Sequence, residues 1–407
     1  MFENLVKQEV STLLVNDIKN NTLPGSILFA GSESSGKLTA ALELARIMSC
    51  TRPNKAAWNC ACPSCLQHKS LVCSNLLLLG PRNCFLEISA AKETFLNAYK
   101  ENASFLIATR YLFLRSIRKL LLRFSSILWQ GDDKINKIGA IVEVINEDLE
   151  QLDFPRELLP FEQTKELCDK LCEKAQELEN SFLPDSISIN QIRNMEQWAH
   201  IKSEEGKKTI IIENADRMQT SVRNALLKIL EEPPADCLFI LLTTRRNAVM
   251  PTILSRVRTY NFKTRTLSEQ NEVISRVFHN DIFNGSINEY LLTFLPVSFS
   301  EIQQIAADFY RTIASSNIPN VAQTVKNCAN FEPRIELRIF LETIALCQKP
   351  LLTNPNGTEA AAESVKVLRQ CWENVTLFNQ SPVSALEILV KDLSKINVMN
   401  DRIFSKI

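Results

Sequence analysis

The chain opens with hydrophobic patterns that switch between helical and strand spacing. From Phe2 to Asn21 apolar residues recur every three or four positions, which predicts a helix, and Pro24 marks its end. The apolar run SILFAG then predicts a buried strand. Residues 37–50 (KLTAALELARIMSC) combine strong helix formers with an apolar stripe, so a strand, a loop and a helix follow one another directly. This order is the first half of a βαβ unit.

The same alternation returns further along, after a long helical stretch. The run LLLLGP at 76–81 predicts a second strand. Residues from 82 to about 184 have three stretches of helical periodicity and no convincing strand, which indicates an inserted helical subdomain. Continuous apolar strands that alternate with helices predict a parallel sheet covered on both faces. The further elements expected are strands at 209–212, 237–244 and 258–262, and a helix at 221–230.

Beyond Phe262 the strand pattern disappears and the remaining residues are helical throughout, which predicts one or two all-helical domains. Glycine content agrees with a helix-rich protein, because the chain has nine glycines in 407 residues, against roughly 7% in average proteins. A chain of this length holds two to four domains at about 100 to 200 residues each.

Charge and hydropathy limit the partners and the cell compartment that can be expected for the chain. Lys plus Arg equals Asp plus Glu at 46 each, so we expect any contact with nucleic acid to be local. The first residues lack the apolar core of a signal peptide, and no uncharged apolar run reaches about 18 residues. We therefore expect a soluble, cytoplasmic protein without a membrane partner.

Five of the twelve cysteines lie between Cys50 and Cys73, which predicts one metal site in a reducing compartment. The spacing C-x9-C-x-C-x2-C offers four thiolates from a short segment and favours tetrahedral, structural zinc. The sequence leaves open whether Cys73 replaces Cys50 as the fourth ligand, with His68 nearby. A set of small buried thiols is the alternative without metal. The candidate zinc ligands are Cys50, Cys60, Cys62 and Cys65.

The most specific local motif is GSESSGK at 31–37, between a predicted strand and a predicted helix. Its glycines let backbone N–H groups converge on phosphate, the helix N-terminus favours negative charge, and the lysine meets the phosphate oxygens. Leu38 stands where Ser or Thr would bind Mg²⁺. The loop therefore either binds ATP with Mg²⁺ or is a relic that keeps the fold and binds nucleotide poorly. The candidate nucleotide-binding residues here are Gly31, Gly36, Lys37 and Thr39.

A second element of a nucleotide site would be an acid at the end of an apolar strand, followed by a residue that activates water. The segment IIIENADRM supplies Glu213 at the first position and Asn214, which cannot accept a proton, at the second. Asp216 is interpreted as a solvated helix cap beyond the strand. Thr244, at the end of the next strand, is a candidate sensor of the γ-phosphate. The altered motifs predict weak or absent ATP hydrolysis by this chain.

Two further features contain arginines: one basic helix face and the single residue Arg256. The helix at 115–123 carries a basic face, which we interpret as a solvated stripe on a helix packed against its own subdomain. A contact with DNA or a partner protein, or a membrane-surface helix, is the alternative. In PTILSRVR a proline opens a short helix with Arg256 at its far end, a rigid mount whose simplest role is a surface ion pair. The basic face consists of Arg115, Arg118, Lys119 and Arg123.

Several motifs, taken in order, make the chain similar to a known family. GSESSGK, the cysteine cluster, ISINQIR, IIIENADRM, NALLKILEEPP and PTILSRVRTYNF resemble the clamp-loader ATPase-like subunits of bacterial DNA polymerase III. The resemblance covers residues 1–81 and 185–262, and residues 82–184 have no counterpart in it. The cysteine spacing departs by one residue from the family's C-x2-C-x2-C.

The resemblance implies an α/β fold of the AAA+ class, with a P-loop parallel-sheet domain at 1–262. That domain would include a zinc module at 50–73 and the helical insertion at about 82–184. A helical lid at 263–327 and a helical collar at 328–407 would follow. The collar would join the other clamp-loader subunits in a hetero-pentameric ring, through which the sliding clamp and primed DNA are reached.

Within the family the chain resembles the delta-prime type more than the gamma/tau motor type. Motor subunits are expected to have Thr after the loop lysine, an Asp-Glu pair and Ser-Arg-Cys, where this chain has Leu38, Glu213 with Asn214, and Ser255-Arg256-Val257. The resemblance implies a component of the DNA polymerase III holoenzyme that acts as a stator and lends Arg256, as an arginine finger, to a neighbouring motor subunit. The alternatives are a gamma/tau-type motor that hydrolyses ATP and a docking role for the insertion.

Overall fold

The computed structural model describes residues 1–52, 57–80, 84–184, 186–203, 206–353, 355–378 and 380–406. Residues 53–56 of the predicted zinc module and 82–83 of the predicted insertion lie outside the described residues. The chain forms two compact units, Met1–Tyr290 and Leu291–Ile407. The division between them falls inside the range 263–327 that the sequence suggested as a lid.

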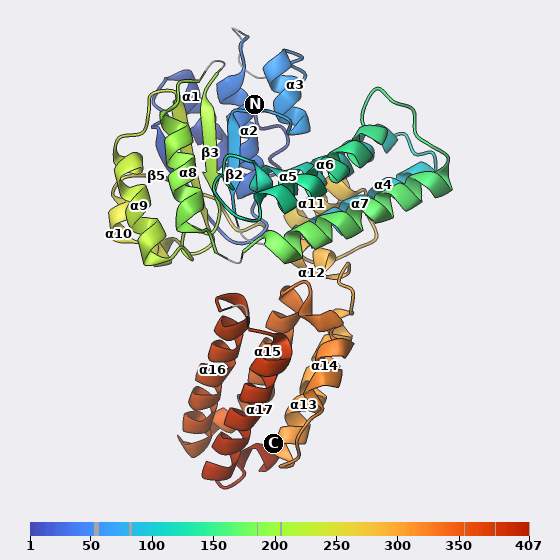
Figure 1. The fold of residues 1–407 in the computed structure, drawn as a ribbon, viewed down its shortest axis with the longest axis vertical. Coiled ribbons are helices and arrows are strands. Elements are labelled where there is room, and N and C mark those ends of the chain that lie inside the picture. The colour runs from blue at the N-terminus through green and yellow to red at the C-terminus, as the bar shows by residue number, and fades with distance from the viewer. Residues whose placement is uncertain are drawn as a thin grey trace. The chain divides into compact units, whose positions relative to one another are not determined.

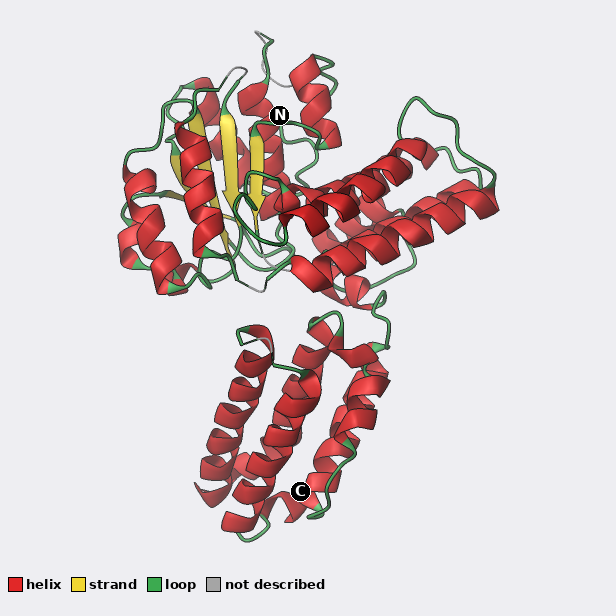
Figure 2. Cartoon of the chain, viewed as in Figure 1, coloured by secondary structure: helices red, strands yellow, loops and turns green. Residues whose placement is uncertain are grey.

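The first unit is built on a five-stranded parallel sheet with the order β2-β3-β4-β1-β5 (Figure 2). This confirms the expectation of an α/β fold with a parallel sheet. The register places Ala30 beside Thr243, so the segments that leave β1 and β4 start at the same edge of the sheet. The strands are β1 (Ser26–Ala30), β2 (Leu76–Leu79), β3 (Lys208–Ile212), β4 (Cys237–Thr243) and β5 (Arg258–Asn261).

Alternate side chains of the strands enter two hydrophobic cores, as expected for a sheet covered on both faces. On one face Ile27 and Phe29 pack with α1 and α2, and on the other Leu28 and Leu241 pack with α8, α9 and the insertion (Figure 1). These covering helices are α1 (Val10–Lys19), α2 (Lys37–Ser49), α8 (Ile189–His200) and α9 (Thr220–Glu231).

The first helix is shorter than the predicted range 2–21. Phe2 and Lys7 have φ values of 63° and 51°, which lie in the left-handed region and interrupt helical geometry before Val10.

Among its described residues, 84–184, the insertion contains four α-helices where the sequence indicated three helical stretches. They lie at the β2 edge of the sheet (Figure 1). Phe95 and Phe113 are fully buried with ring centroids 6.0 Å apart, in the same core as Leu28 and Leu77 of the sheet. The insertion therefore shares its core with the sheet. Its helices are α4 (Phe85–Lys100), α5 (Leu106–Leu121), the 3₁₀ turn η1 (Leu122–Phe124), α6 (Ile135–Gln151) and α7 (Phe161–Phe182).

The remaining described elements are helical, as predicted for the residues after 262. In the second unit α13 packs on α15, and α16 packs on α17. Among the residues that the structure describes, no helix combines the length and the apolar character needed to cross a bilayer. These further helices are α3 (Pro63–Ser70), α10 (Pro251–Leu254), α11 (Leu267–Phe278), α12 (Ile287–Leu292), α13 (Phe299–Ala314), α14 (Val321–Asn327), α15 (Ile335–Cys347), α16 (Pro355–Thr376) and α17 (Pro382–Met399).

Candidate functional site

The loop between β1 and α2, called here the β1–α2 loop, lies at the carboxyl edge of the sheet, where open α/β folds bind ligands. The N–H of Gly31 donates to Thr243 O at 3.2 Å and fixes the loop to the end of β4. A Cβ added at Gly31 would lie 2.7 Å from Phe262 O. Gly36 has φ 91°, and a Cβ there would lie 2.8 Å from Leu5 Cδ1. Both positions therefore depend on glycine.

Lys37 begins α2 and points back into the loop. Its Nζ donates to Gly31 O at 2.8 Å, to Ser32 O at 2.5 Å and to Ser35 Oγ at 3.1 Å. Burial lowers the pKa of Lys37 to about 8, against the opposing attraction of Glu33 and other acids. A phosphate that approached this lysine would have to replace the loop's own oxygens.

Polar contacts from outside the loop hold its tip. Ser34 Oγ donates to Asn288 Oδ1 at 2.5 Å, and Asn288 Nδ2 donates to Glu33 Oε2 at 3.2 Å. Buried Arg265 donates from Nη1 to Ser34 O and from Nη2 to Val6 O. Sequence reasoning missed Asn288 and Arg265, which lie 254 and 231 residues from Ser34 and belong to no motif.

The side chain of Glu213 turns toward β2. Its N–H donates to Leu79 O at 2.8 Å, and a Cβ added at Gly80 would lie 2.3 Å from its Oε2, so the carboxylate lies directly over Gly80. Since β2 and β1 lie on opposite sides of β3, this direction is away from the β1–α2 loop. Glu213 Oε2 accepts a hydrogen bond from Arg123 Nη2 and forms an ion pair with it.

Asp216 is the acid that bonds to the end of β4, the strand next to β1. Its side chain is fully buried, and its oxygens accept from Thr243 Oγ1 at 2.7 Å and from Arg245 Nε at 3.1 Å. The interpretation of Asp216 as a solvated helix cap is therefore wrong, because the turn after β3 folds back onto β4. Thr244 is half-buried directly after β4, and Thr39 is half-buried in the first turn of α2. It is Thr243 whose hydroxyl bonds to the acid.

Arg256 follows the short helix α10, whose first residue is Pro251. Its guanidinium donates to Glu231 Oε2 from Nε at 3.0 Å and from Nη2 at 2.9 Å, and to Thr252 O from Nη1 at 2.9 Å. The Arg256 side chain is 28% exposed and that of Glu231 is 58% exposed. The guanidinium is therefore at the surface of the first unit, held by one exposed carboxylate.

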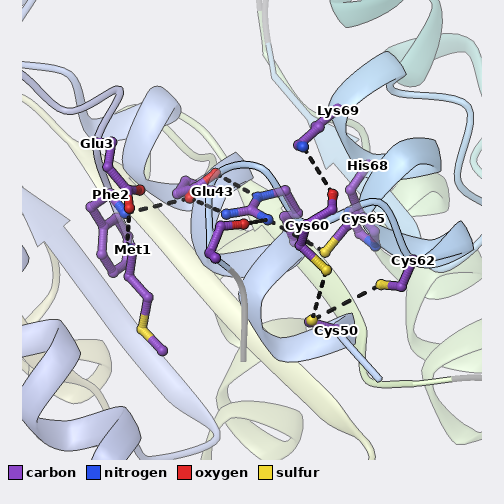
Figure 3. A network of polar contacts seen from close by, with 12 residues as sticks. Met1, Phe2, Glu3, Glu43, Cys50, Cys60, Cys62, Cys65, His68 and Lys69 are labelled. Atoms are coloured by element: carbon purple, nitrogen blue, oxygen red, sulfur yellow. Dashed lines mark hydrogen bonds and ion pairs between the residues drawn. The ribbon is translucent and has the colours of Figure 1, made fainter. Parts of the chain in front are cut away.

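The four predicted zinc ligands converge, with all their Sγ atoms within 4.8 Å of one another (Figure 3). Cys50 Sγ lies 3.8 Å from Cys60 Sγ and 4.0 Å from Cys62 Sγ. Tetrahedral ligands at about 2.3 Å from zinc would be about 3.8 Å apart, so the spacing fits a closed metal site. Cys73 Sγ lies 3.5 Å from His68 Nδ1 instead. The full set of converging sulfurs is Cys50, Cys60, Cys62 and Cys65.

Hydrogen bonds favour a thiolate at Cys62, whereas burial and the other thiols of the cluster raise the pKa of Cys65. Burial raises the pKa of Cys62, but the backbone N–H groups of Cys65 and Thr51 outweigh burial and lower that pKa to about 6. Arg46 Nη1 donates to Cys65 Sγ at 3.3 Å, and its Nε and Nη2 bond to Glu43. Arg46 belongs to α2, so the cysteine cluster is bonded to the helix that follows the β1–α2 loop.

The basic face of the helix at 115–123 is not solvated, and that interpretation is wrong. All four side chains are buried or half-buried, because η1 packs against β2 and α5 packs against α3, α4 and α7. The face is therefore engaged in contacts within the first unit. The internal contacts are Arg115 with His68 O, Arg118 with Asp153, Lys119 with Glu87 and Arg123 with Glu213.

The fold and the site together define an α/β protein with a parallel five-stranded sheet and a lysine-bearing loop at its carboxyl edge. The model of the family described as DNA polymerase III, delta subunit, matches residues 6–123 and 124–266, which is more than half of the chain. The chain belongs to this family. The matched residues run through the helical insertion, for which the sequence motifs offered no counterpart.

Curated relatives match shorter stretches. The delta-prime subunit of DNA polymerase III from Bacillus subtilis is 39% identical over 83 residues, which are 20% of this chain and 25% of that protein. The tau subunit from the same organism is 44% identical over 59 residues, 14% of this chain and 10% of that protein. The matches thus span a quarter or less of these relatives.

A solved structure of a gamma subunit-related protein of DNA polymerase III from Thermotoga maritima is also similar. The match covers 56% of this chain and 90% of the Thermotoga maritima chain, at 17% identity and a TM-score of 0.27. The family assignment therefore comes from the sequence matches.

Proposed function

We propose that the chain is a delta-prime-like subunit of the DNA polymerase III clamp loader, which helps to load the sliding clamp onto primed DNA during replication. In this role it donates Arg256 as an arginine finger to the ATP of a neighbouring subunit. The observation that carries the proposal is the surface position of Arg256, whose side chain is 28% exposed and bonds to the exposed carboxylate of Glu231, to Thr252 O and to Ser255 Oγ. An arginine finger acts in trans and needs no working ATP site in its own subunit.

The chain's own residues do not fit a Mg²⁺ site. Leu38 offers no oxygen ligand after Lys37, and Glu213 is paired with Arg123. Asn214 cannot act as a base. We therefore assign no hydrolysis step to this chain, and ATP binding by Gly31, Gly36 and Lys37 stays a proposal.

Measurement of ATP turnover by the purified chain tests the proposal that this chain does not hydrolyse ATP. We expect no turnover above that of Lys37→Ala, which removes the ammonium group that would contact phosphate. Turnover at the rate of a motor subunit that disappears in Lys37→Ala would contradict the proposal. That result would favour the second candidate, a gamma/tau-type motor. The match to the tau subunit from Bacillus subtilis supports this candidate.

We propose that the cysteine cluster holds one structural zinc ion. The ligands would be Cys50, Cys60, Cys62 and Cys65, whose spacing suits tetrahedral thiolate coordination. When bound, the zinc would cross-link the segment between α2 and α3. Arg46 would stabilise the negative charge of the thiolates through Cys65.

The chain's other assignments are also proposals. The helices at 263–327 would form a lid and those at 328–407 a collar that joins the neighbouring subunits in a hetero-pentameric ring. The cytoplasm is the compartment in which such a replication complex works. Support for the collar comes from apolar side chains that α16 and α17 leave exposed, namely Val365, Ile388 and Val398.

A further inference from the structure

Arg123 is a buried guanidinium that the inserted helices hold in place. It belongs to η1, directly after α5, and only 5% of the residue is exposed. Its Nη1 donates to Lys119 O at 2.6 Å, and its backbone carbonyl accepts from Trp129 Nε1 at 2.9 Å. Its Nη2 donates to Glu213 Oε2. Both the backbone and the head group of Arg123 are therefore fixed.

One half-buried and one buried acid lie near enough to influence this guanidinium. Glu213 follows β3, and Glu179 lies on α7 and is 3% exposed. Glu179 Oε1 accepts from the N–H of Cys84 at 3.1 Å. Burial lowers the pKa of Arg123, but the nearby acidic groups, Glu213 and Glu179 among them, outweigh burial and raise that pKa above its usual value. Carboxylate oxygens are also among the ligands through which proteins bind divalent cations.

The backbone beside Glu213 is adapted to this pair. The carboxylate reaches Arg123 by passing over Gly80, where any side chain would collide with it, since an added Cβ would lie 2.3 Å from Oε2. Glycine at the end of β2 therefore permits the direction that Glu213 takes. The pair joins the insertion to the sheet across 90 residues of sequence.

We propose that Arg123 stands in for the divalent cation at Glu213, so that the inserted helices keep this acid from binding metal. The sequence places Glu213 where related sites bind Mg²⁺, and the structure gives its carboxylate to an internal cation instead. The insertion thereby adds to Leu38 and Asn214 in making the chain's own nucleotide site unfit for hydrolysis. This inference deepens the proposed non-hydrolysing role and rests on it.

Titration of the full chain with Mn²⁺ alone tests the inference. Bound Mn²⁺ is measured from the decrease in the electron paramagnetic resonance signal of the free ion. The variants are Arg123→Met, Glu213→Gln and the double variant, which accounts for Mn²⁺ held elsewhere. We expect Arg123→Met to bind Mn²⁺ at least tenfold more tightly than the wild type and the double variant. A folded Arg123→Met chain without this gain would overturn the inference.

The Glu213→Gln variant decides the matter even if Arg123→Met does not fold, because glutamine keeps the size of the side chain and an oxygen that accepts from Arg123. We expect wild type and Glu213→Gln to bind Mn²⁺ equally within twofold. A tenfold loss in Glu213→Gln would mean that the wild-type carboxylate already binds metal and would overturn the inference. ATP turnover by the isolated chain would refute the proposed function whatever the Mn²⁺ result, so the two failures are distinguishable.

Discussion

At the scale of single residues, the charged groups near the β1–α2 loop are bonded within the chain. Lys37 Nζ donates to two loop carbonyls, and Asp216 accepts from Thr243 and Arg245. Each of these contacts would have to be exchanged before the group could serve a ligand. The conformation of the loop is therefore held by contacts within the chain.

The first prediction concerns the pH dependence of stability at Lys37. Its pKa falls from 10.5 to about 8, so between these values the unfolded chain binds a proton that the folded chain has released. The free energy of unfolding of the wild type should therefore rise with pH across this window relative to Lys37→Met, by up to about 3 kcal/mol at about 1.4 kcal/mol for each pKa unit.

Urea unfolding at pH 7 to 10.5 measures this difference. Lys19→Met, at an exposed position on α1, is the matched control and should show no such trend. A constant difference between wild type and Lys37→Met over the whole range would contradict the assignment of the lowered pKa.

The second prediction tests the metal cluster. Cys62→Ser removes one of four converging sulfurs and the thiol with the lowered pKa, so bound zinc should fall from about one ion per chain to well below one. Cys73→Ser is the control, because Cys73 contacts His68 outside the cluster and its loss should leave zinc content unchanged. Metal analysis of the purified chains measures the zinc content of both variants. Equal zinc loss in the two variants would argue against the assigned ligands.

At the scale of elements, α5 connects the insertion to the rest of the first unit. Its basic residues pair with carbonyls of α3 and with acids on α4 and on the segment after α6. Arg123 in η1 pairs with Glu213 after β3. These contacts bond the charged groups of α5 inside the protein and fix the insertion to the rest of the first unit.

The third prediction follows from the Arg118–Asp153 pair. Arg118→Ala should lower the free energy of unfolding by about 1–3 kcal/mol, less than for a fully buried pair because Asp153 is one-third exposed. Affinity for primed DNA should stay the same. Lys137→Ala, at an exposed position on α6, should change neither quantity. Weaker DNA binding by Arg118→Ala at unchanged stability would show that α5 does contact DNA.

Sequence reasoning worked at this scale wherever the signal is local. Apolar runs such as those of β1 and β4, the glycines of the β1–α2 loop and the proline that opens α10 each act over a few residues, so their patterns reveal the element. The directions of Glu213 and of the α5 arginines depend on partners that folding brings together, 90 residues apart for Arg123 and Glu213. Periodicity cannot tell a solvated arginine from one that meets an acid on a distant helix.

At the scale of the whole molecule, the two compact units differ in secondary structure, and the helical character of the residues after 262 was predicted from the sequence. The first unit contains the sheet, and the second consists of helices among its described residues. In the second unit Ile388 and Val398 of α17 are 41% and 65% exposed. Exposed apolar side chains on a helical unit suit an interface with other subunits.

The fourth prediction tests that interface. Val398→Asp should weaken assembly with the other clamp-loader subunits at least tenfold, because it places a charge in an apolar contact. The free energy of unfolding should change by no more than about 0.5 kcal/mol, as for other surface substitutions. Lys366→Asp, at an exposed polar position on α16, is the control. Copurification and analytical size exclusion read assembly, and unchanged assembly of Val398→Asp would remove this surface from the interface.

The most direct test of the account measures ATP hydrolysis by the assembled complex, with clamp and primed DNA, when this chain carries Arg256→Ala. An arginine finger contributes a factor of about 10³–10⁵ at the site it serves, so the rate of the complex should fall at least twofold even if its other sites are unaffected. Arg246→Ala, at an exposed position nearby, should leave the rate unchanged. Equal rates for Arg256→Ala and wild type, with assembly intact, would contradict the claim that this chain serves a neighbour's ATP.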